Sequence, residues 1–182
     1  GDATKQARTP TIDWLYTHCP HATLSASGED VGLVNGQMGD SNVGHLNIGA
    51  GRIVYQDVAR ISKAARTGEL QNNPAILQAI NTAKERGSTL HFMGLVSPGG
   101  VHSHTDHLYA LVQMAKDHGL EYAAIHAFLD GRDVPPTSGR GYVEDLEEAL
   151  ASIGLGTIAT VSGRYYAMDR DKRWERTDLA YN

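Results

Sequence analysis

Three short apolar runs, separated by segments of helical periodicity, constrain the fold of this 182-residue chain more than any other feature. They cover residues 90–96, 122–128 and 157–161, and each has the length of a buried strand. The segments between them, 106–118 and 142–152, place apolar residues three or four positions apart, which predicts amphipathic helices. Strands that alternate with helices of this length predict βαβ units and a parallel sheet. We therefore expect an α/β fold with a parallel sheet and flanking helices.

Helix signals also occur outside this region. Pro10 fits the first position of a short helix. Two further helical patterns end at Gly68 and Gly87, residues suited to a left-handed C-terminal cap. Residues 22–25 predict a short strand, and Trp174 is expected to begin a helix that packs on the sheet.

The first third of the chain is rich in loops, and regular α/β units begin near residues 52–56. We therefore predict two units, residues 1–55 and 56–182. A hydrophobic content of 41% is enough to bury a core in a chain of this length. A net charge of −5 argues against nucleic acid as a partner, because nucleic-acid binding favours a basic surface.

The chain has one cysteine, Cys19, which cannot form an internal disulfide and is expected to be structural or incidental. We see no signal peptide and no apolar run of membrane-spanning length. These features predict a cytoplasmic protein without a membrane partner.

Ser41 lies in a glycine-rich segment, residues 35–52, which we call the serine segment. Glycine permits unusual backbone angles and close approach of a ligand, so the segment is suited to present Ser41 to a reaction partner. A helix that started near Ser41 would favour a phosphoryl group there, because its first N–H groups are unpaired. Two interpretations stay open: Ser41 is a nucleophile, or it only caps that helix.

Three polar clusters follow the three apolar runs, at residues 97–107, 129–133 and 162–174. In an open parallel sheet the ligand site lies at the carboxyl ends of the strands, so these clusters should meet at one edge. Guanidinium groups bind phosphate and carboxylate in a bidentate manner, which predicts a site for a small anion that carries both. The clusters contribute His102, His104, Arg132, Arg164, Arg170 and Arg173, interleaved with Asp130, Asp133 and Asp169.

Simpler roles remain open for the same residues. Arginine–aspartate pairs on loops are often surface salt bridges of little energetic weight. His102, His104 and His107 could bind a metal ion, or some of them could cap the helix that follows. We expect Tyr165, Tyr166 and Met168 to serve in packing.

The serine segment and the three clusters together resemble the cofactor-independent phosphoglycerate mutases, metal-dependent enzymes of the alkaline phosphatase superfamily. The resemblance runs from about Thr9 to the end of the chain. It has departures: Asp40 precedes the serine where asparagine is expected, and Asn42 follows it where glutamate is expected. The first residues, 1–7, are also fewer than the pattern requires.

The resemblance implies that 3-phosphoglycerate and 2-phosphoglycerate are interconverted through a phosphoserine in glycolysis and gluconeogenesis. It implies a partial phosphatase-like domain at residues 1–55 and most of a phosphotransferase domain at residues 56–182. Ser41 is then both the catalytic nucleophile and a metal ligand. The residues implied to bind substrate are His102, Arg132, Asp133, Arg164 and Arg170.

The resemblance also implies two divalent metal ions, of manganese type, and no 2,3-bisphosphoglycerate cofactor. The other metal ligands are expected outside this chain, so we expect the chain alone to be inactive, and a monomer. Two alternatives stay open: a non-catalytic phosphoglycerate-binding module, and another metal-dependent phosphatase or phosphotransferase of the superfamily. A nucleotide-binding domain fits less well, because the glycine spacing matches neither the dinucleotide nor the P-loop pattern.

Overall fold

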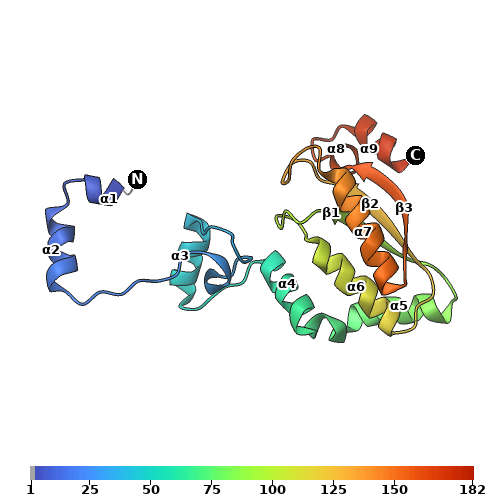
Figure 1. Ribbon diagram of the computed structural model, residues 1–182, viewed down its shortest axis with the longest axis horizontal. Helices are drawn as coiled ribbons and strands as arrows, with labels where there is room; N and C mark the ends of the chain where they lie inside the picture. Colours follow the sequence, from blue (N-terminus) through green and yellow to red (C-terminus); the bar gives the residue numbers. More distant parts are fainter. Residues whose placement is uncertain (1–2) are drawn as a thin grey trace.

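In the computed structural model, which describes residues 3–182, three parallel strands form the sheet (Figure 1). The strands are β1 (Leu90–Val96), β2 (Ala123–Leu129) and β3 (Thr157–Gly163), and they lie side by side in chain order. All three runs predicted to be strands are strands, each parallel to its neighbour. The predicted α/β fold with a parallel sheet is thus confirmed.

Helices α6 (Thr105–Asp117) and α7 (Gly139–Ile153) connect the strands, as the periodicity predicts. Helix α5 (Pro74–Glu85) precedes β1. Apolar side chains of these three helices pack with those of the strands in one core, because burial of apolar surface is the main favourable term in folding. The largest fully buried side chains are Ile80, Val96, Val112, Met114, Ile125 and Leu146.

The opposite face of the sheet is polar in part. His91 Nδ1 lies 2.9 Å from His126 Nε2, and His126 Nδ1 lies 2.9 Å from Thr160 Oγ1, so hydrogen bonds cross all three strands. Met93, on the same strand as His91, is 71% exposed on the surface. One side of the sheet therefore packs in the apolar core, and the other side is exposed and carries this polar row.

The helix end predicted at Gly68 is also found. Helix α4 (Asp57–Thr67) ends at Gly68, whose φ of 77° is left-handed and favours glycine. The short turn η2 (Glu69–Asn72) follows, and the Asn73 side chain then caps α5 by accepting the N–H groups of its first turn.

The N-terminal part extends away from the sheet (Figure 1). It holds α1 (Ala3–Gln6), α2 (Pro10–His18), the turn η1 (Gly28–Val31) and α3 (Ser41–Ala50). Helix α2 begins at Pro10 as predicted, but it buries none of its residues. Cys19, directly after α2, is a free cysteine.

The strand expected at residues 22–25 is wrong. These residues have no regular structure, and Leu24 is 88% exposed. A strand needs a neighbour to accept and donate its backbone hydrogen bonds. In the described part of the chain, this region forms only an isolated bridge, between Ser27 and Met38.

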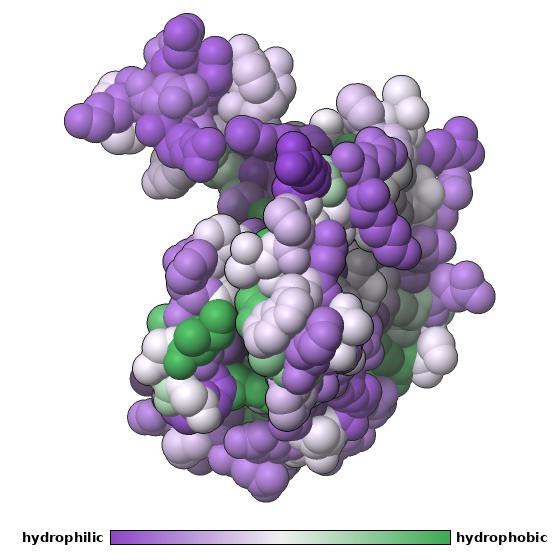
Figure 2. All heavy atoms as spheres, turned by 90° about the vertical axis from the view of Figure 1, so that its left-hand side faces the viewer, coloured by the Kyte–Doolittle hydropathy of each residue, from purple (hydrophilic) through white to green (hydrophobic). Residues whose placement is uncertain are grey.

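The chain ends with α8 (Arg164–Ala167) and α9 (Trp174–Tyr181), which pack against each other beyond the carboxyl end of β3 (Figure 1). A helix begins at Trp174 as predicted, but the expected packing on the sheet is wrong: Trp174 is 71% exposed, and α9 packs on α8 instead. The face in Figure 2 is largely hydrophilic, with small separate apolar patches. Within residues 3–182, no helix has the length and apolar character needed to cross a membrane.

Candidate functional site: an arginine-lined cleft at the carboxyl edge of the sheet

Asp130, the first residue after β2, joins the ends of all three strands. Its side chain is only 2% exposed. Its Oδ2 accepts a hydrogen bond of 2.7 Å from Ser97 Oγ, at the end of β1. Its Oδ1 accepts one of 2.7 Å from Arg164 Nη1, directly after β3. The same Oδ1 also accepts the backbone N–H groups of Arg132 and Asp133, which shapes the loop after β2.

These bonds decide the charge of Asp130. Burial alone would raise its pKa. Hydrogen bonds from the Asp133 N–H, the Ser97 hydroxyl, the Arg164 guanidinium and the Arg132 N–H outweigh burial and lower the pKa to about 2. The carboxylate is therefore ionised at neutral pH, and protein groups satisfy it without a ligand.

Arg164 binds a second carboxylate as well. Its Nη1 lies 2.7 Å from Asp133 Oδ2, and hydrogen bonds to Asp133 and then Asp130 raise the pKa of the guanidinium. The Arg164 side chain is 14% exposed, so it is held in place with little freedom. His102 Nε2 lies 3.6 Å from the same Asp133 oxygen. The three polar clusters therefore meet, as predicted for loops at one edge of a parallel sheet.

A cleft of about 640 Å³ opens beside this network, and we call it the arginine cleft. Four of the residues predicted to bind substrate line it: His102, Arg132, Arg164 and Arg170. The fifth, Asp133, is bonded to the cleft residues Arg164 and His102. Within residues 3–182, Arg132 and Arg170 pair with no carboxylate, so both charges are available to a ligand.

Other residues of the three polar clusters do not line the arginine cleft. Arg173 is exposed and does not line the arginine cleft. His104 caps α6, because its Nδ1 accepts the Asp106 N–H at 3.2 Å, which confirms one of the alternatives left open. His107 is buried, with its Nε2 2.7 Å from Ser62 Oγ. In the described part of the chain, no three His, Cys, Asp or Glu side chains group so that they could hold a metal ion.

Sequence reasoning missed Arg176, which also lines the arginine cleft. It lies in the first turn of α9, and its spacing from the 162–174 cluster gave no signal that it would turn back to the cleft. Tyr165 and Met168 line the cleft as well, and the Tyr165 ring packs against Tyr166, with the ring centres 5.1 Å apart. Tyr166 is 41% exposed.

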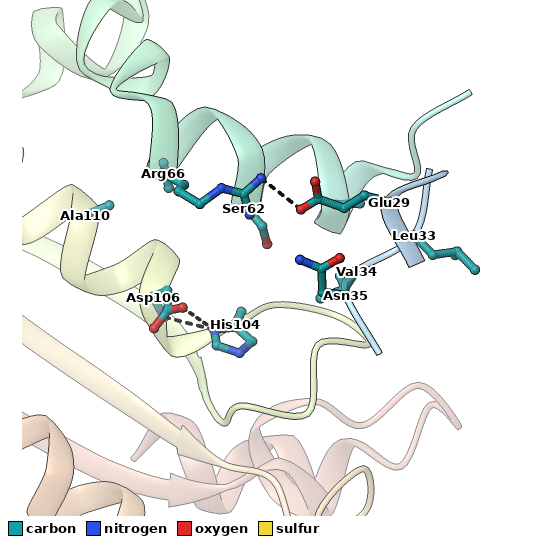
Figure 3. Close-up of a pocket in the computed structure, with 11 residues that line it drawn as sticks. Glu29, Leu33, Val34, Asn35, Ser62, Arg66, His104, Asp106 and Ala110 are labelled. Carbon is teal, nitrogen blue, oxygen red and sulfur yellow. Dashed lines mark hydrogen bonds and ion pairs between the residues drawn. The ribbon is translucent and has the colours of Figure 1, made fainter. Parts of the chain in front are cut away.

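A separate cleft of about 350 Å³ lies between η1, α4 and the start of α6 (Figure 3). Its arginine is already paired, because Arg66 Nη2 lies 2.8 Å from Glu29 Oε1, and Asp106 adds a second carboxylate beside the His104 that caps α6. It shares no lining residue with the arginine cleft. Because its lining has two carboxylates and one arginine, this second cleft is less suited to an anion.

Ser41 is the first residue of α3, and the N-cap is Asp40. The Asp40 carboxylate accepts the Val43 N–H at 2.9 Å, so the interpretation of Ser41 as the helix cap is wrong. Ser41 is exposed, and its Oγ lies 3.1 Å from His45 Nδ1. That nitrogen is also 2.6 Å from the Ser41 carbonyl, which can only accept, so Nδ1 carries the hydrogen. His45 Nδ1 is therefore not a base for the Ser41 hydroxyl.

Ser41 does not line the arginine cleft, but its neighbours approach the loop that carries His102. Asp40 and Asn42 line a small cleft, of about 180 Å³, together with Gly100 and Val101. The serine segment and the first polar cluster are thus close together, although 60 residues separate Asp40 from Gly100 in the sequence.

Comparison with known proteins gives a consistent result. A family model described as BPG-independent PGAM N-terminus (iPGM_N) matches residues 61–182. Over 181 residues the chain is 61% identical to the 2,3-bisphosphoglycerate-independent phosphoglycerate mutase of Moorella thermoacetica. The match covers 100% of this chain and 35% of that protein. The enzyme of the same name from Clostridium acetobutylicum is 58% identical over 182 residues, with 100% and 36% covered.

Among solved structures, the chain is similar to a Leishmania mexicana phosphoglycerate mutase crystallised at low cobalt concentration. The TM-score is 0.72 at 34% identity, and the match covers 99% of this chain and 34% of that one. The chain thus spans about a third of the length of the relatives it matches.

Proposed function

The chain belongs to the BPG-independent phosphoglycerate mutase family, and from this premise we propose that it supplies the substrate-binding cleft and the nucleophile of such an enzyme. The reaction would interconvert 3-phosphoglycerate and 2-phosphoglycerate in glycolysis and gluconeogenesis. The observation that carries the proposal is the arginine cleft, in which arginines from two strand ends and one following loop face a common space. We also propose a cytoplasmic monomer, which fits the composition of the chain.

The cleft suits the substrate by its charge. Phosphoglycerate carries a phosphate and a carboxylate, and guanidinium groups bind both in a bidentate manner. We assign these anionic groups to Arg132 and Arg170, which are exposed and unpaired in the described chain, with His102 beside them. Arg164 is held by Asp130 and Asp133, so its guanidinium does not have to be ordered on binding, and the unpaired charges that attract the ligand are those of Arg132 and Arg170.

The reaction would use Ser41 as the nucleophile. Its Oγ would form a bond to phosphorus while the bond from the glycerate oxygen to phosphorus breaks, and the proton of Ser41 would pass to the freed glycerate hydroxyl. The other glycerate hydroxyl would then form a bond to phosphorus while the bond from Ser41 Oγ to phosphorus breaks, and its proton would return to Ser41. Asp133, next to Arg164 and His102, is our candidate to hold the glycerate hydroxyls.

The two metal ions implied by the resemblance do not fit the residues described here. Ser41 would be one ligand, but Asp40 is engaged as a helix cap, and no three potential ligands group together in residues 3–182. We propose that the remaining ligands, of manganese type or similar, belong to a part of the longer protein not included in this chain. The prediction follows that the 182-residue chain with added manganese does not isomerise 3-phosphoglycerate.

Isothermal titration of the purified chain with 3-phosphoglycerate tests the cleft. We expect Arg132→Met and Arg170→Met each to weaken binding by about tenfold or more, the loss expected for one charged hydrogen-bonded contact. Arg60→Met is the matched control, because Arg60 is exposed and pairs with Asp57 within α4, a helix that contributes no residue to the cleft. Equal losses in all three variants would show that only net charge matters, and would refute a specific cleft.

One observation supports a second candidate, a binding module without turnover. Ser41 is exposed, and its neighbour His45 cannot accept its proton through Nδ1. A module would bind 3-phosphoglycerate equally well as wild type and as Ser41→Ala. In the longer protein, a phosphoryl group on Ser41, detected by mass spectrometry after incubation with substrate, would instead support the enzyme.

A further inference from the structure

The loop between α8 and α9 carries Arg170 and is shaped by a buried carboxylate. The Asp169 side chain is 2% exposed. Its Oδ2 accepts the backbone N–H groups of Arg173, at 2.8 Å, and Asp171, at 3.2 Å. Lys172, between these two donors, has a φ of 60°, a left-handed conformation disfavoured for lysine. The hydrogen bonds to Asp169 therefore hold the loop in a shape that it would not keep without them.

Arg176 connects this carboxylate to the two helices. Its Nη1 lies 3.4 Å from Asp169 Oδ1, and its guanidinium carbon lies 4.1 Å from the centre of the Tyr165 ring on α8. A guanidinium over an aromatic ring is held by both its charge and its planar shape. The Arg176 side chain is 20% exposed, so these contacts leave it little freedom. Together the three side chains form a unit that we call the Asp169 brace, made of Tyr165, Asp169 and Arg176.

All members of the Asp169 brace line the arginine cleft, as does Arg170. Arg170 differs from them, because it is exposed and has no carboxylate partner among the described residues. Its direction therefore depends on the backbone of the loop rather than on contacts of its own side chain. Removing Arg176 would leave the buried Asp169 charge without its cationic partner, which favours rearrangement of that loop.

We propose that Arg176 is a positioning residue that acts through the Asp169 brace to direct Arg170 into the arginine cleft. The inference deepens the proposed function and rests on it for the identity of the ligand, an anion with phosphate and carboxylate groups. The brace itself is a property of the chain without ligand. Its two consequences, loop order and ligand affinity, can therefore be measured separately.

Loop order is measured by amide hydrogen exchange in the free chain. In Arg176→Met we expect the amides of Asp171 and Arg173, both bonded to Asp169, to exchange about tenfold faster, while core amides such as that of Ile125 are unchanged. Arg173→Met, read at the Asp171 amide alone, is the matched control, because it removes the same charge from an exposed neighbour. Unchanged exchange at these two amides in Arg176→Met would overturn the brace.

Ligand affinity is measured by titration with 3-phosphoglycerate, in a double-mutant cycle with Arg170. We expect Arg176→Met to weaken binding about tenfold in the wild-type chain and to have no further effect when Arg170 is methionine. Additive losses would mean that Arg176 contacts the ligand itself, and would overturn a positioning role. If the wild-type chain binds no 3-phosphoglycerate, the proposed function fails, and the exchange rates still decide whether the brace exists.

Discussion

Arg164 Nη1 lies 2.7 Å from Asp130 Oδ1, an ion pair that joins the end of β3 to the end of β2. Both side chains are largely buried, at 14% and 2% exposure. A buried pair of this kind is sensitive to the loss of either partner, because the other charge is then left without compensation. The pair therefore links the stability of the sheet edge to the arrangement of the arginine cleft.

The acid stability of the chain should depend on Asp130. Its pKa is lowered from 3.8 to about 2 in the folded state, so its carboxylate stabilises the fold above pH 4 and this contribution is lost between about pH 4 and pH 2. The shift corresponds to about 2 kcal/mol. We expect urea unfolding of Asp130→Asn to show lower stability at pH 7 and a flatter fall in acid. Parallel curves for wild type and variant between pH 4 and pH 2 would contradict this role.

Arg164→Met should destabilise the chain by about 3 kcal/mol, because it leaves two carboxylates near each other without their shared cation. In the double variant with Asp130→Asn, part of this loss should be recovered, since one of the two charges is gone. Unfolding free energies of the two single variants and the double variant measure the coupling. Strictly additive losses would show that Arg164 and Asp130 do not stabilise each other.

Substitutions of Asp40 and of Ser41 should have different effects on the stability of α3. We expect Asp40→Ala to destabilise the helix by about 1 kcal/mol, the usual effect of losing an N-cap, and to speed exchange of the Val43 amide. Ser41→Ala should leave that amide unchanged, because the Ser41 hydroxyl does not cap the helix. The reverse order of effects would restore Ser41 as the cap.

Gly32 should not tolerate alanine. Its φ is 80°, and an added Cβ would lie 2.8 Å from Tyr55 Cα, so the turn would have to open. The Gln56 N–H, which donates to the Gly32 carbonyl at 2.8 Å, should then exchange faster. Gly44→Ala is the matched control: an added Cβ meets nothing within 4 Å there, and the change should stabilise α3 by about 0.5–1 kcal/mol. Similar Gln56 exchange in both variants would count against the strained turn.

Local patterns were sufficient to predict the α/β part of the fold. The strand Leu90–Val96 has the predicted bounds, and the predicted helix end at Gly68 is found, because caps and apolar periodicity depend on neighbouring residues only. Residues 22–25 failed for the opposite reason: whether they form a strand depends on a partner elsewhere. The expected packing of the helix that begins at Trp174 also failed, because the local sequence does not determine that α9 packs on α8 rather than on the sheet.

The candidate site was likewise predictable in part. The rule that ligands bind at the carboxyl ends of parallel strands was enough to bring His102, Arg132 and Arg164 together. It could not show that Asp130 holds four hydrogen-bond donors, or that Arg176 stacks on Tyr165, because these contacts need the three-dimensional path of the loops.

The sheet adds its strands in the order in which the chain is made, β1, then β2, then β3. β2 and β3 therefore each have a neighbour already made when they leave the ribosome, and β1 waits only for the strand that follows it in the chain. Pairings between nearby parts of a chain close smaller loops and form faster than distant pairings. During synthesis, the βαβ units of this chain can thus be completed one at a time, with little exposure of unpaired strand edges to aggregation.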